Sequence, residues 1–354
     1  MNAFYGTADQ VSAQSGGGHV TANELQALRE VAGDVVVIGH QQMADSLSKL
    51  TDTPFLADYL MAYLAHKALD QGTLGLAHFY SGTCTQTIAL LKARGIPVTY
   101  TSPAHNRALT IEEYTRMGIN YPYPHIRDDA LWAIFKRGLL DANLVVTPSR
   151  ASAEFLASEG CQRLEVIPHG CIPPATIPPL PPDLQVGYLG QTGPDKGLVY
   201  LIGAWGKLNW PTPPLSLAGS GTERLGPMVG RVTNGGRFQL LGWTANPAKF
   251  YASISVYVQP SVSEAFGIPA LEAMAHGRPV VCSEGAGVSE LVTEGIDGFV
   301  VPRRSQEAIA ERLAWFRANP HRIDPMGQRA REKALKYTWP IIRERYKVLW
   351  RTLL

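Results

Sequence analysis

Cysteine is scarce in this chain, with four residues among 354, namely Cys84, Cys161, Cys171 and Cys282. No two of them form a Cys-x-x-Cys pair, and none clusters with histidine at a spacing typical of metal ligands. These absences argue against a disulfide scaffold and against a cysteine-based metal site. We expect reduced and mostly buried thiols, because free cysteine behaves as a small apolar residue.

Long hydrophobic runs are also absent. No apolar stretch reaches the roughly 20 residues that a transmembrane helix needs. The first residues, Met-Asn-Ala-Phe-Tyr-Gly, have neither the basic nor the apolar region of a secretory signal. Hydrophobic residues make up 45% and charged residues 18%, which is typical of a soluble globular protein. The default expectation is a cytoplasmic protein.

The net charge of +2 is unevenly distributed. Residues 1–172 carry 12 Lys and Arg against 16 Asp and Glu, giving −4, and residues 173–354 carry 20 against 14, giving +6. A basic half suits an anionic ligand such as a nucleoside diphosphate. Much of the excess lies within residues 303–351, so peripheral attachment at the inner membrane face is the alternative to a purely cytoplasmic location.

Both halves of the chain alternate apolar strand-like runs with helix-like stretches, which indicates parallel sheets with right-handed crossovers. The expected strands are Val35–Ile38, Leu74–His78, Pro97–Thr101, Leu144–Thr147, Leu164–Ile167, Gln185–Gly190, Leu215–Ala218, Phe238–Leu241, Val256–Gln259, Pro279–Cys282 and Phe299–Val301. The expected helices are Ala22–Val31, Asp58–Asp70, Thr85–Arg94, Asp128–Leu140, Ser149–Glu159, Gly197–Trp205, Pro247–Ala252, Pro269–His276, Val288–Thr293 and Gln306–Ala318.

A proline-rich segment separates the two halves. Six of the twelve residues Ile172–Asp183 are proline, which neither a helix nor a central strand tolerates. We interpret residues 173–183 as a stiff linker between a domain of residues 1–172 and a domain of residues 184–336. Residues 337–354 are expected to form a terminal helix.

The most informative segment runs from Gln259 to Val281. An apolar run leads into a loop with Glu264, a Gly-Ile-Pro turn starts a short apolar helix, and a second apolar run follows. Pro269 suits the first turn of a helix, where its missing N–H costs nothing. The loop therefore ends at a helix N-terminus, which favours an anion. The adjacent carboxylate indicates that the ligand also carries hydroxyl groups, as a sugar does.

Glu264, Phe266, Gly267, Glu272, Ala273, Ala275, Gly277 and Pro279 carry a family resemblance. Their segment resembles the donor-binding signature of family 4 of the retaining glycosyltransferases, and residues 285–292 and 295–301 continue the pattern. The resemblance implies the α/β fold called GT-B, in which two Rossmann-like domains flank a deep cleft. The first domain would bind the acceptor and the second the nucleotide-sugar, and the terminal helix would cross back to the first domain.

The resemblance also implies roles for individual residues of this segment. Glu264, a catalytic candidate, would orient the sugar hydroxyls, and Glu272 would accept hydrogen bonds from the ribose. Backbone N–H groups would position the sugar and the diphosphate, and they belong to Ala265, Phe266, Gly267 and Ile268.

The loop Gly190–Gly197 follows an expected strand and opens an expected helix. In the family this loop usually carries an arginine after its first glycine and a lysine before its last, and both contact the donor diphosphate. Lys196 matches the lysine and is a second catalytic candidate. Gln191 stands where the arginine is expected, and it supplies dipoles but no charge. Either the phosphate contacts are weaker here, or another cation replaces the missing one.

Three further places complete the expected site. Gly17 and Gly18 belong to a glycine triplet ahead of a helix expected near Thr21, where a backbone can approach a ligand closely. By resemblance they face the donor phosphate and the acceptor. Gly242 and Trp243 end a strand and would lie beside the nucleotide base, with Trp243 either stacking on it or packing in the protein. His105, one or two residues later than the family's usual histidine, is the third catalytic candidate.

Several motifs of other enzyme classes are missing: an Asp-x-Asp pair, a Walker loop and a Gly-x-Gly-x-x-Gly fingerprint. We expect no metal and no cofactor, and the resemblance implies that basic groups and a helix N-terminus stabilise the leaving diphosphate in place of a metal ion. The expected function is a retaining, metal-independent transfer of a hexosyl-type sugar from a nucleotide-sugar to an acceptor hydroxyl. A UDP-sugar is favoured, and GDP- and ADP-sugars are alternatives.

Two other functions stay open at this point. One is a non-catalytic nucleotide-sugar-binding protein, and the other is a phosphorylase or hydrolase on the same scaffold. No nucleic-acid partner is expected, and the sequence does not indicate an oligomeric state.

Overall fold

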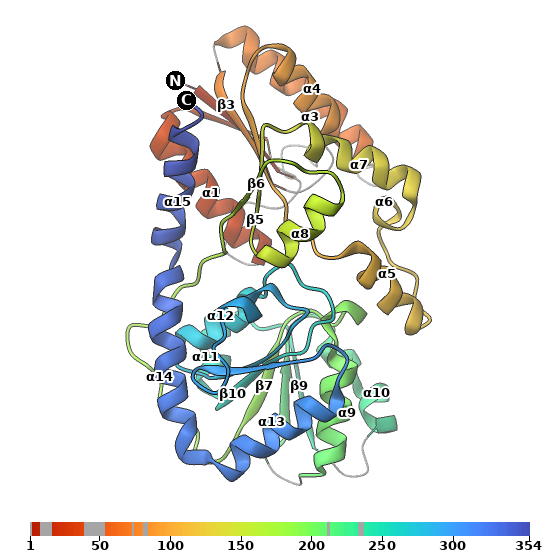
Figure 1. Cartoon of the computed structure of the whole chain (residues 1–354), viewed down its shortest axis with the longest axis vertical. Helices are drawn as coiled ribbons and strands as arrows, with labels where there is room; N and C mark the ends of the chain where they lie inside the picture. Colours follow the sequence, from red (N-terminus) through yellow and green to blue (C-terminus); the bar gives the residue numbers. More distant parts are fainter. Residues whose placement is uncertain are drawn as a thin grey trace. The chain divides into compact units, whose positions relative to one another are not determined.

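The computed structural model describes residues 2–7, 16–38, 54–72, 74–80, 84–210, 213–232 and 237–354. The chain divides into two compact units, each built on a parallel sheet (Figure 1). The first comprises Met1–Ala104, Tyr121–His169 and Trp339–Leu354, and the second comprises His105–Asn120 and Gly170–Thr338. The last helix therefore clusters with the first unit. Residues 105–120, which the expected boundary at 172 assigns to the first domain, cluster with the second unit.

The sheet of the first unit has the strand order β2-β1-β3-β4-β5-β6. Its strands are β1 (Asn2–Thr7), β2 (Val35–Ile38), β3 (Leu74–Tyr80), β4 (Val98–Thr101), β5 (Leu144–Thr147) and β6 (Leu164–Val166). Its helices are α1 (Gly16–Ala32), α3 (Pro54–Gln71), α4 (Thr85–Ala93), α6 (Pro124–Arg127), α7 (Asp129–Asp141), α8 (Arg150–Ser158) and α15 (Trp339–Arg351). Helices α1 and α15 lie side by side on one face, and α3, α4 and α7 lie on the other (Figure 1).

A buried polar cluster explains why α15 packs on this sheet. The Tyr5 hydroxyl donates to Glu24 at 2.9 Å, and His78 Nε2 lies 3.3 Å from the same carboxylate. The rings of Tyr346 and Trp350 on α15 lie 6.2 and 5.0 Å from the His78 ring. Burial raises the pKa of Tyr5 and of Tyr346, so both hydroxyls stay protonated and can donate hydrogen bonds.

The sheet of the second unit has the order β12-β11-β10-β7-β8-β9. Its strands are β7 (Val186–Leu189), β8 (Leu215–Ala218), β9 (Phe238–Gly242), β10 (Val256–Gln259), β11 (Val280–Ser283) and β12 (Gly298–Val301). Its α-helices are α5 (Arg107–Arg116), α9 (Leu198–Leu208), α10 (Gly226–Val232), α11 (Pro247–Ala252), α12 (Ile268–Ala275), α13 (Gln306–Ala318) and α14 (Ile323–Ala334). The chain reverses its direction of strand addition between β7 and β10, where crevices for ligands form in such sheets.

Two apolar clusters cover the two faces of this second sheet. One joins the strands to α9 and α13 through residues such as Trp205 and Phe316, and the other joins them to α11, α12 and α14 through residues such as Tyr251 and Met274. All five helices flank the sheet in Figure 1. The strands other than the edge strand β9 are largely buried on both faces, which accounts for their nearly unbroken apolar sequences.

The eleven expected strands are all present, with ends shifted by at most two residues. Strand β1 was not expected, although it is central in its sheet. Helix α1 begins at Gly16, so it starts before the expected position, and the expected helix at Val288–Thr293 is a 3-10 helix at Gly287–Leu291. Helices α5, α6, α10 and α14 were not expected either.

The proline-rich segment is held against the second unit and does not run free. The buried Arg278 side chain donates from Nη2 to the carbonyl oxygens of Pro178 at 3.1 Å and Pro179 at 3.2 Å. Arg331 Nη2 donates to the Pro174 carbonyl at 2.7 Å. Prolines leave carbonyl groups without adding N–H groups, so a guanidinium with several donors suits them.

All four cysteines are buried and free, as expected. Burial raises the pKa of Cys161 to about 11 and of Cys171 to about 12, and it also raises the pKa of Cys84 and Cys282. The thiolate is the reactive form. At mildly alkaline pH, a colorimetric thiol reagent should therefore react slowly with the native protein and rapidly with four thiols after unfolding in guanidinium. A native thiol that reacts as fast as in the unfolded chain would contradict this.

Among the described helices, none combines the length and the apolar character required to cross a membrane.

Candidate active site

The candidate site lies at the carboxyl ends of β7 and β10 in the second unit. The loop Gly190–Gly197 follows β7, and the loop Pro260–Gly267 follows β10. These two strands are neighbours in the sheet, and the order of the strands reverses between them. The fold therefore brings the two predicted donor-binding loops together at the place where open α/β sheets bind ligands.

The loop after β7 is compact. Pro194–Lys196 form one turn of 3-10 helix, and Gly197 follows with a φ of +67°. A Cβ atom at Gly197 would overlap with the Pro260 carbonyl oxygen, so a larger side chain would push the two loops apart. The loop conformation thus depends on glycine at this position.

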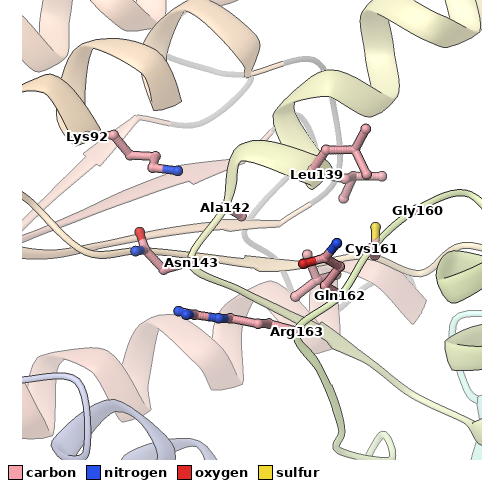
Figure 2. A pocket seen from close by; sticks show the side chains of 10 residues that line it. Lys92, Leu139, Ala142, Asn143, Gly160, Cys161, Gln162 and Arg163 are labelled. Carbon is pink, nitrogen blue, oxygen red and sulfur yellow. The ribbon is translucent and has the colours of Figure 1, made fainter.

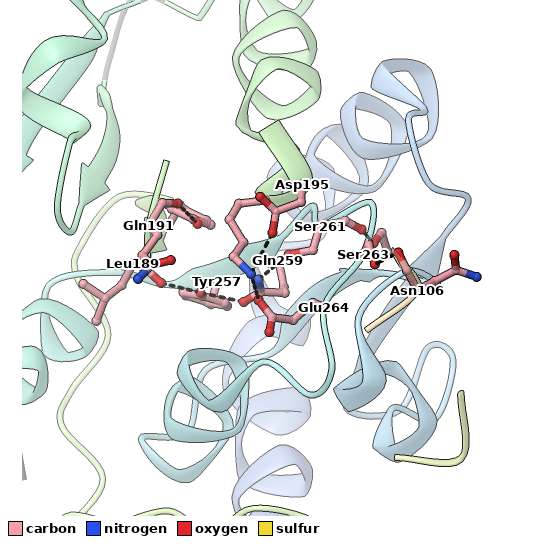
Figure 3. A network of polar contacts seen from close by, with 12 residues as sticks. Asn106, Leu189, Gln191, Asp195, Tyr257, Gln259, Ser261, Ser263 and Glu264 are labelled. Atoms are coloured by element: carbon pink, nitrogen blue, oxygen red, sulfur yellow. Dashed lines mark hydrogen bonds and ion pairs between the residues drawn. The ribbon is translucent and has the colours of Figure 1, made fainter. Parts of the chain in front are cut away.

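Lys196 is held between two carboxylates. Its Nζ lies 2.7 Å from Glu264 Oε2 and 3.0 Å from Asp195 Oδ2 (Figure 3). Only 13% of the Lys196 side chain is exposed. Burial by itself lowers the pKa of Lys196, but the charges and hydrogen bonds of Glu264 and Asp195 outweigh it and hold the pKa above its ordinary value. Lys196 is therefore a permanent cation here. Sequence reasoning predicted Lys196 and Glu264 but did not single out Asp195.

The loop that carries Glu264 is fixed on both sides by backbone hydrogen bonds. The N–H groups of Val262 and Ser263 donate to the Asp195 carbonyl at 2.8 and 3.3 Å. On the other side, the Glu264 N–H donates to the Gly285 carbonyl oxygen at 2.9 Å, and the Gly287 N–H donates to the Glu264 backbone carbonyl oxygen at 3.1 Å. The Glu264 carboxylate is thereby placed with little conformational freedom left to lose on binding.

Helix α12 begins at the end of this loop. Gly267 is its N-cap with a φ of +100°, Ile268 is its first residue, and Pro269 lies in its first turn. The first N–H groups of a helix have no partner within the helix, and together they favour an anion. Ala265 and Phe266 are buried and pack the loop against the core. The expected turn and helix start are thus present.

Glu272 lies one turn into α12 and is only half-buried. Its Oε2 accepts a hydrogen bond from the Tyr251 hydroxyl at 2.7 Å. Burial raises the pKa of Glu272, and the Tyr251 hydrogen bond opposes this rise. Tyr251 therefore orients the carboxylate, and its other oxygen is not used by that bond. The sequence did not indicate Tyr251, because 21 residues separate it from Glu272.

The remaining predicted residues of this unit lie at the same edge of the sheet. The Gln191 side chain is exposed, and its backbone carbonyl accepts a hydrogen bond from Tyr188 at 2.6 Å. Gly242 ends β9 with a φ of +67°, and Trp243 follows with 61% of its surface exposed. So exposed a ring does not belong to the core, and stacking of Trp243 on a base stays a prediction.

His105 is the first residue of segment 105–120, which clusters with the second unit. The next residue, Asn106, caps α5 and accepts a hydrogen bond on its carbonyl from Ser263 Oγ at 3.2 Å (Figure 3). Ser263 directly precedes Glu264, so the chain near His105 is tied to the Glu264 loop. The tie was missed because α5 buries only Thr110 and Glu113 and shows no apolar periodicity.

Gly17 and Gly18 belong to the first unit, and here the expectation of a loop is wrong. Both lie in the first turn of α1, which begins at Gly16. The Thr21 hydroxyl donates to the Gly18 carbonyl at 3.0 Å. Glycine has low helix propensity, so the triplet concealed the helix start. Residues 8–15 ahead of it lie outside the described part of the chain. The roles of both glycines stay predictions.

A pocket of about 490 Å³ lies elsewhere in the first unit (Figure 2). Lys92, Asn143, Cys161 and Arg163 help to line it. Asn143 directly precedes β5 and Arg163 directly precedes β6, so the pocket is at the amino ends of these strands. It contains none of the predicted site residues, and ligands of such sheets bind at the opposite edge. Within the described ranges, no group of three or more His, Cys, Asp or Glu is arranged to hold a metal ion.

Comparison with known proteins identifies the sequence of the second unit. Residues 178–334 match the model of the family "Glycosyl transferases group 1". The D-inositol 3-phosphate glycosyltransferase of Kribbella flavida is 36% identical over 105 residues, which are 30% of this chain and 25% of the relative. The chain thus matches about a quarter of that relative's length.

Two solved structures share the fold. Sucrose-phosphate synthase from Thermosynechococcus elongatus has a TM-score of 0.77 at 20% identity, covering 100% of this chain and 99% of the other. Anabaena Alr3699/HepE in complex with UDP has a TM-score of 0.74 at 17% identity, covering 99% and 100%. At such identities the likeness concerns the fold. The chain therefore has the GT-B fold predicted from its sequence, and its residues 178–334 match the family model of the glycosyl transferases group 1.

Proposed function

We propose that this protein is a retaining glycosyltransferase of the family 4 type that moves a sugar from a nucleoside diphosphate to an acceptor hydroxyl. One observation carries the proposal: a permanent cation and a carboxylate, Lys196 and Glu264, meet at 2.7 Å at the strand-order reversal of a group 1 domain. A cation suits a leaving diphosphate, and a carboxylate suits sugar hydroxyls.

The roles follow from the position of each group. The diphosphate binds at Lys196 and at the N–H groups that begin α12, with the backbone from Ala265 to Ile268 around it. Glu264 accepts hydrogen bonds from the sugar hydroxyls. Glu272, oriented by Tyr251, accepts those of the ribose, and Trp243 stacks on the base. By the family resemblance, Gly17 and Gly18 face the donor phosphate and the acceptor, and His105 contacts the donor sugar or the acceptor.

The reaction exchanges two bonds at the anomeric carbon. The bond to the diphosphate oxygen breaks and takes its electron pair to the diphosphate, whose charge Lys196 and the α12 N-terminus stabilise. The acceptor oxygen attacks from the same face, and its proton passes to the departing phosphate oxygen. Because these groups are the protein's own, we propose that the transfer needs neither a metal nor a further cofactor.

A UDP-sugar is the donor that we favour. The solved structures of Anabaena Alr3699/HepE include complexes with UDP and with UDP-glucose, and they share this fold at TM-scores of 0.74 and 0.72. GDP- and ADP-sugars remain the alternatives. The residues that we place beside the base are Gly242 and Trp243, and an aromatic ring can stack on any base.

The proposal predicts that one nucleoside diphosphate stabilises the full-length protein. In a thermal-shift screen of UDP, GDP, ADP and their sugars, the true donor raises the unfolding midpoint by mass action. Its sugar should then be transferred to members of an acceptor panel, with the anomeric configuration retained in the product's NMR spectrum and with undiminished rate in EDTA. No shift with any nucleotide would contradict the proposal, inversion would contradict the retaining mechanism, and loss of rate in EDTA would contradict metal independence.

Gln191 favours a second candidate, a non-catalytic nucleotide-sugar-binding protein, because it removes a charge from the phosphate loop. Calorimetry of nucleotide-sugar binding, combined with an assay of turnover, distinguishes the transferase from the non-catalytic binding protein. Binding of the sugar nucleotide without turnover on any acceptor, on water or on free phosphate supports the second candidate. Turnover with water or phosphate alone supports a hydrolase or a phosphorylase.

A further inference from the structure

The donor site described above holds little positive charge for a diphosphate. The formal charges of Asp195, Lys196 and Glu264 sum to −1, because one cation is shared by two carboxylates. Gln191 adds no charge. A diphosphate that binds there brings further negative charge into a partly buried place, where like charges repel strongly. If the proposed function holds, a second cation is needed, and the inference below rests on that function.

Helix α5 begins close to the loop that carries Glu264, and its first residue is a cation. Asn106 precedes the helix, and its carbonyl accepts a hydrogen bond from Ser263 Oγ at 3.2 Å. The Ser263 N–H in turn donates to the Asp195 carbonyl at 3.3 Å. In Figure 3, Asn106 and Ser263 lie together at one end of the polar network that includes Asp195 and Glu264. The residue after Asn106 is Arg107, the first of α5, and it is half-buried.

The face of α5 that carries Arg107 meets the phosphate loop. A Cβ atom added to Gly193 would lie 2.9 Å from the Tyr114 hydroxyl, so Tyr114 lies against that loop. Residues seven apart in a helix share a face. Arg107 and Tyr114 are seven apart, and the same side of α5 therefore presents both to the loops after β7 and β10.

The position of α5 is fixed by a second set of contacts. The fully buried Glu113 accepts hydrogen bonds from the Tyr200 hydroxyl at 2.5 Å and from Arg304 Nε at 2.7 Å. Burial and the Glu113 hydrogen bond raise the pKa of Tyr200 to about 12. Tyr200 lies in α9 and Arg304 follows β12, so both belong to the second unit. The helix is thus anchored at its middle as well as at its start.

Three of the four charges of α5 are opposite to those that the helix dipole favours, and Arg116 in the last turn is the exception. Arg107 lies in the first turn, where carboxylates are stabilising, and Glu112 and Glu113 lie near the end, where cations are stabilising. Natural sequences break such local rules mainly at functional sites. The two glutamates are accounted for by their ion pairs with Arg304. A bound anion would stabilise a cation at the position of Arg107.

We propose that Arg107 binds the donor diphosphate and replaces the arginine that is missing at position 191. Arg107 follows Asn106, whose carbonyl is hydrogen-bonded to the residue before Glu264, so we assign it to the phosphate that carries the sugar. A guanidinium suits this role because its planar fork binds two phosphate oxygens at once.

The test compares the binding of UDP, GDP and ADP, and of UMP, GMP and AMP, to full-length variants by calorimetry. For the diphosphate that binds the wild type, Arg107→Gln should raise the Kd at least about tenfold, as expected for a lost hydrogen-bonded charge. The Kd of the matching monophosphate should stay unchanged. The double variant Arg107→Gln/Gln191→Arg should recover most of the loss. Unchanged thermal unfolding midpoints establish that the variants are folded.

Two arginines serve as matched controls. Arg116 lies at the far end of α5 and pairs with Glu112, so Arg116→Gln should bind like the wild type. Arg224 is the competing cation, because it follows β8 near the phosphate loop. The proposal is overturned if Arg107→Gln binds the diphosphate with the wild-type Kd, or if its Kd for the monophosphate rises by the same factor. It is also overturned if Arg224→Gln or the addition of EDTA raises the Kd of the diphosphate more than Arg107→Gln does. A wild type that binds no diphosphate overturns the proposed function itself, and the proposal with it.

Discussion

Replacing Lys196 by alanine is expected to lower the turnover number by about 10²–10³-fold, the loss typical of removing one group that stabilises a developing negative charge. Lys196 Nζ lies 2.7 Å from Glu264 Oε2, and the Lys196 side chain is only 13% exposed. Its removal leaves Asp195 and Glu264 without their shared partner, so the site repels the diphosphate both when it binds and when it leaves. Initial rates at saturating donor would measure the loss.

Lys207→Ala is the matched control for this experiment. Lys207 lies in α9 of the same unit and pairs with Glu307, and both side chains are about half exposed or more. Removing it changes the net charge of the protein equally, and surface ion pairs contribute little to stability. Turnover of Lys207→Ala should match the wild type. If Lys196→Ala retains rates within threefold of Lys207→Ala, Lys196 does not act on the leaving group.

The strands were the most predictable part of this fold. Both sheets are parallel and their inner strands are buried, so strands such as Val256–Gln259 and Val280–Ser283 are short apolar runs between loops, and the sequence alone indicates them. Strand β1 was missed because it is not a continuous apolar run. Its sequence Asn-Ala-Phe-Tyr-Gly-Thr mixes polar, aromatic and small residues. Its central place follows only from pairing with β2 and β3.

The residues of the candidate site also differ in how well the sequence predicts them. Glu264, Gly267 and Glu272 lie in one continuous segment, so their spacing is visible in the sequence. Contacts between distant segments are not visible. Glu113 and Arg304 are 191 residues apart, and their pairing places α5 in the second unit. No hydrophobic pattern in the sequence indicates α5, because a buried ion pair and hydrogen bonds hold this helix in place.

The proline-rich segment shows what composition leaves out. Its prolines exclude helix and central strand, and the interpretation as a stiff linker stays a prediction, but the composition does not show which hydrogen bonds the proline carbonyl groups accept. Carbonyl groups of Pro174, Pro178 and Pro179 accept hydrogen bonds from Arg331 and Arg278. The predicted domain boundaries themselves stay predictions.

Gly197→Ala is expected to lower the free energy of unfolding of the second unit by about 2–5 kcal/mol. The left-handed backbone at Gly197 costs a residue with a Cβ atom roughly 1–2 kcal/mol. Overpacking costs a further ~1–3 kcal/mol, because the new methyl group would overlap with the Pro260 carbonyl oxygen. Urea unfolding followed by fluorescence measures the change.

Gly295→Ala separates these two contributions. Gly295 has nearly the same backbone, with a φ of +71° against +67° at Gly197, and it lies in the same unit. A Cβ atom there would meet no atom within 4 Å. Gly295→Ala should therefore lose only the backbone contribution and should bind the donor nucleotide normally. Gly197→Ala should lose more stability and also bind the nucleotide more weakly, because moving Pro260 displaces the chain that leads to Glu264. Equal losses in the two variants would mean that the loops after β7 and β10 yield easily, and that their close contact at Gly197 does not hold the site in place.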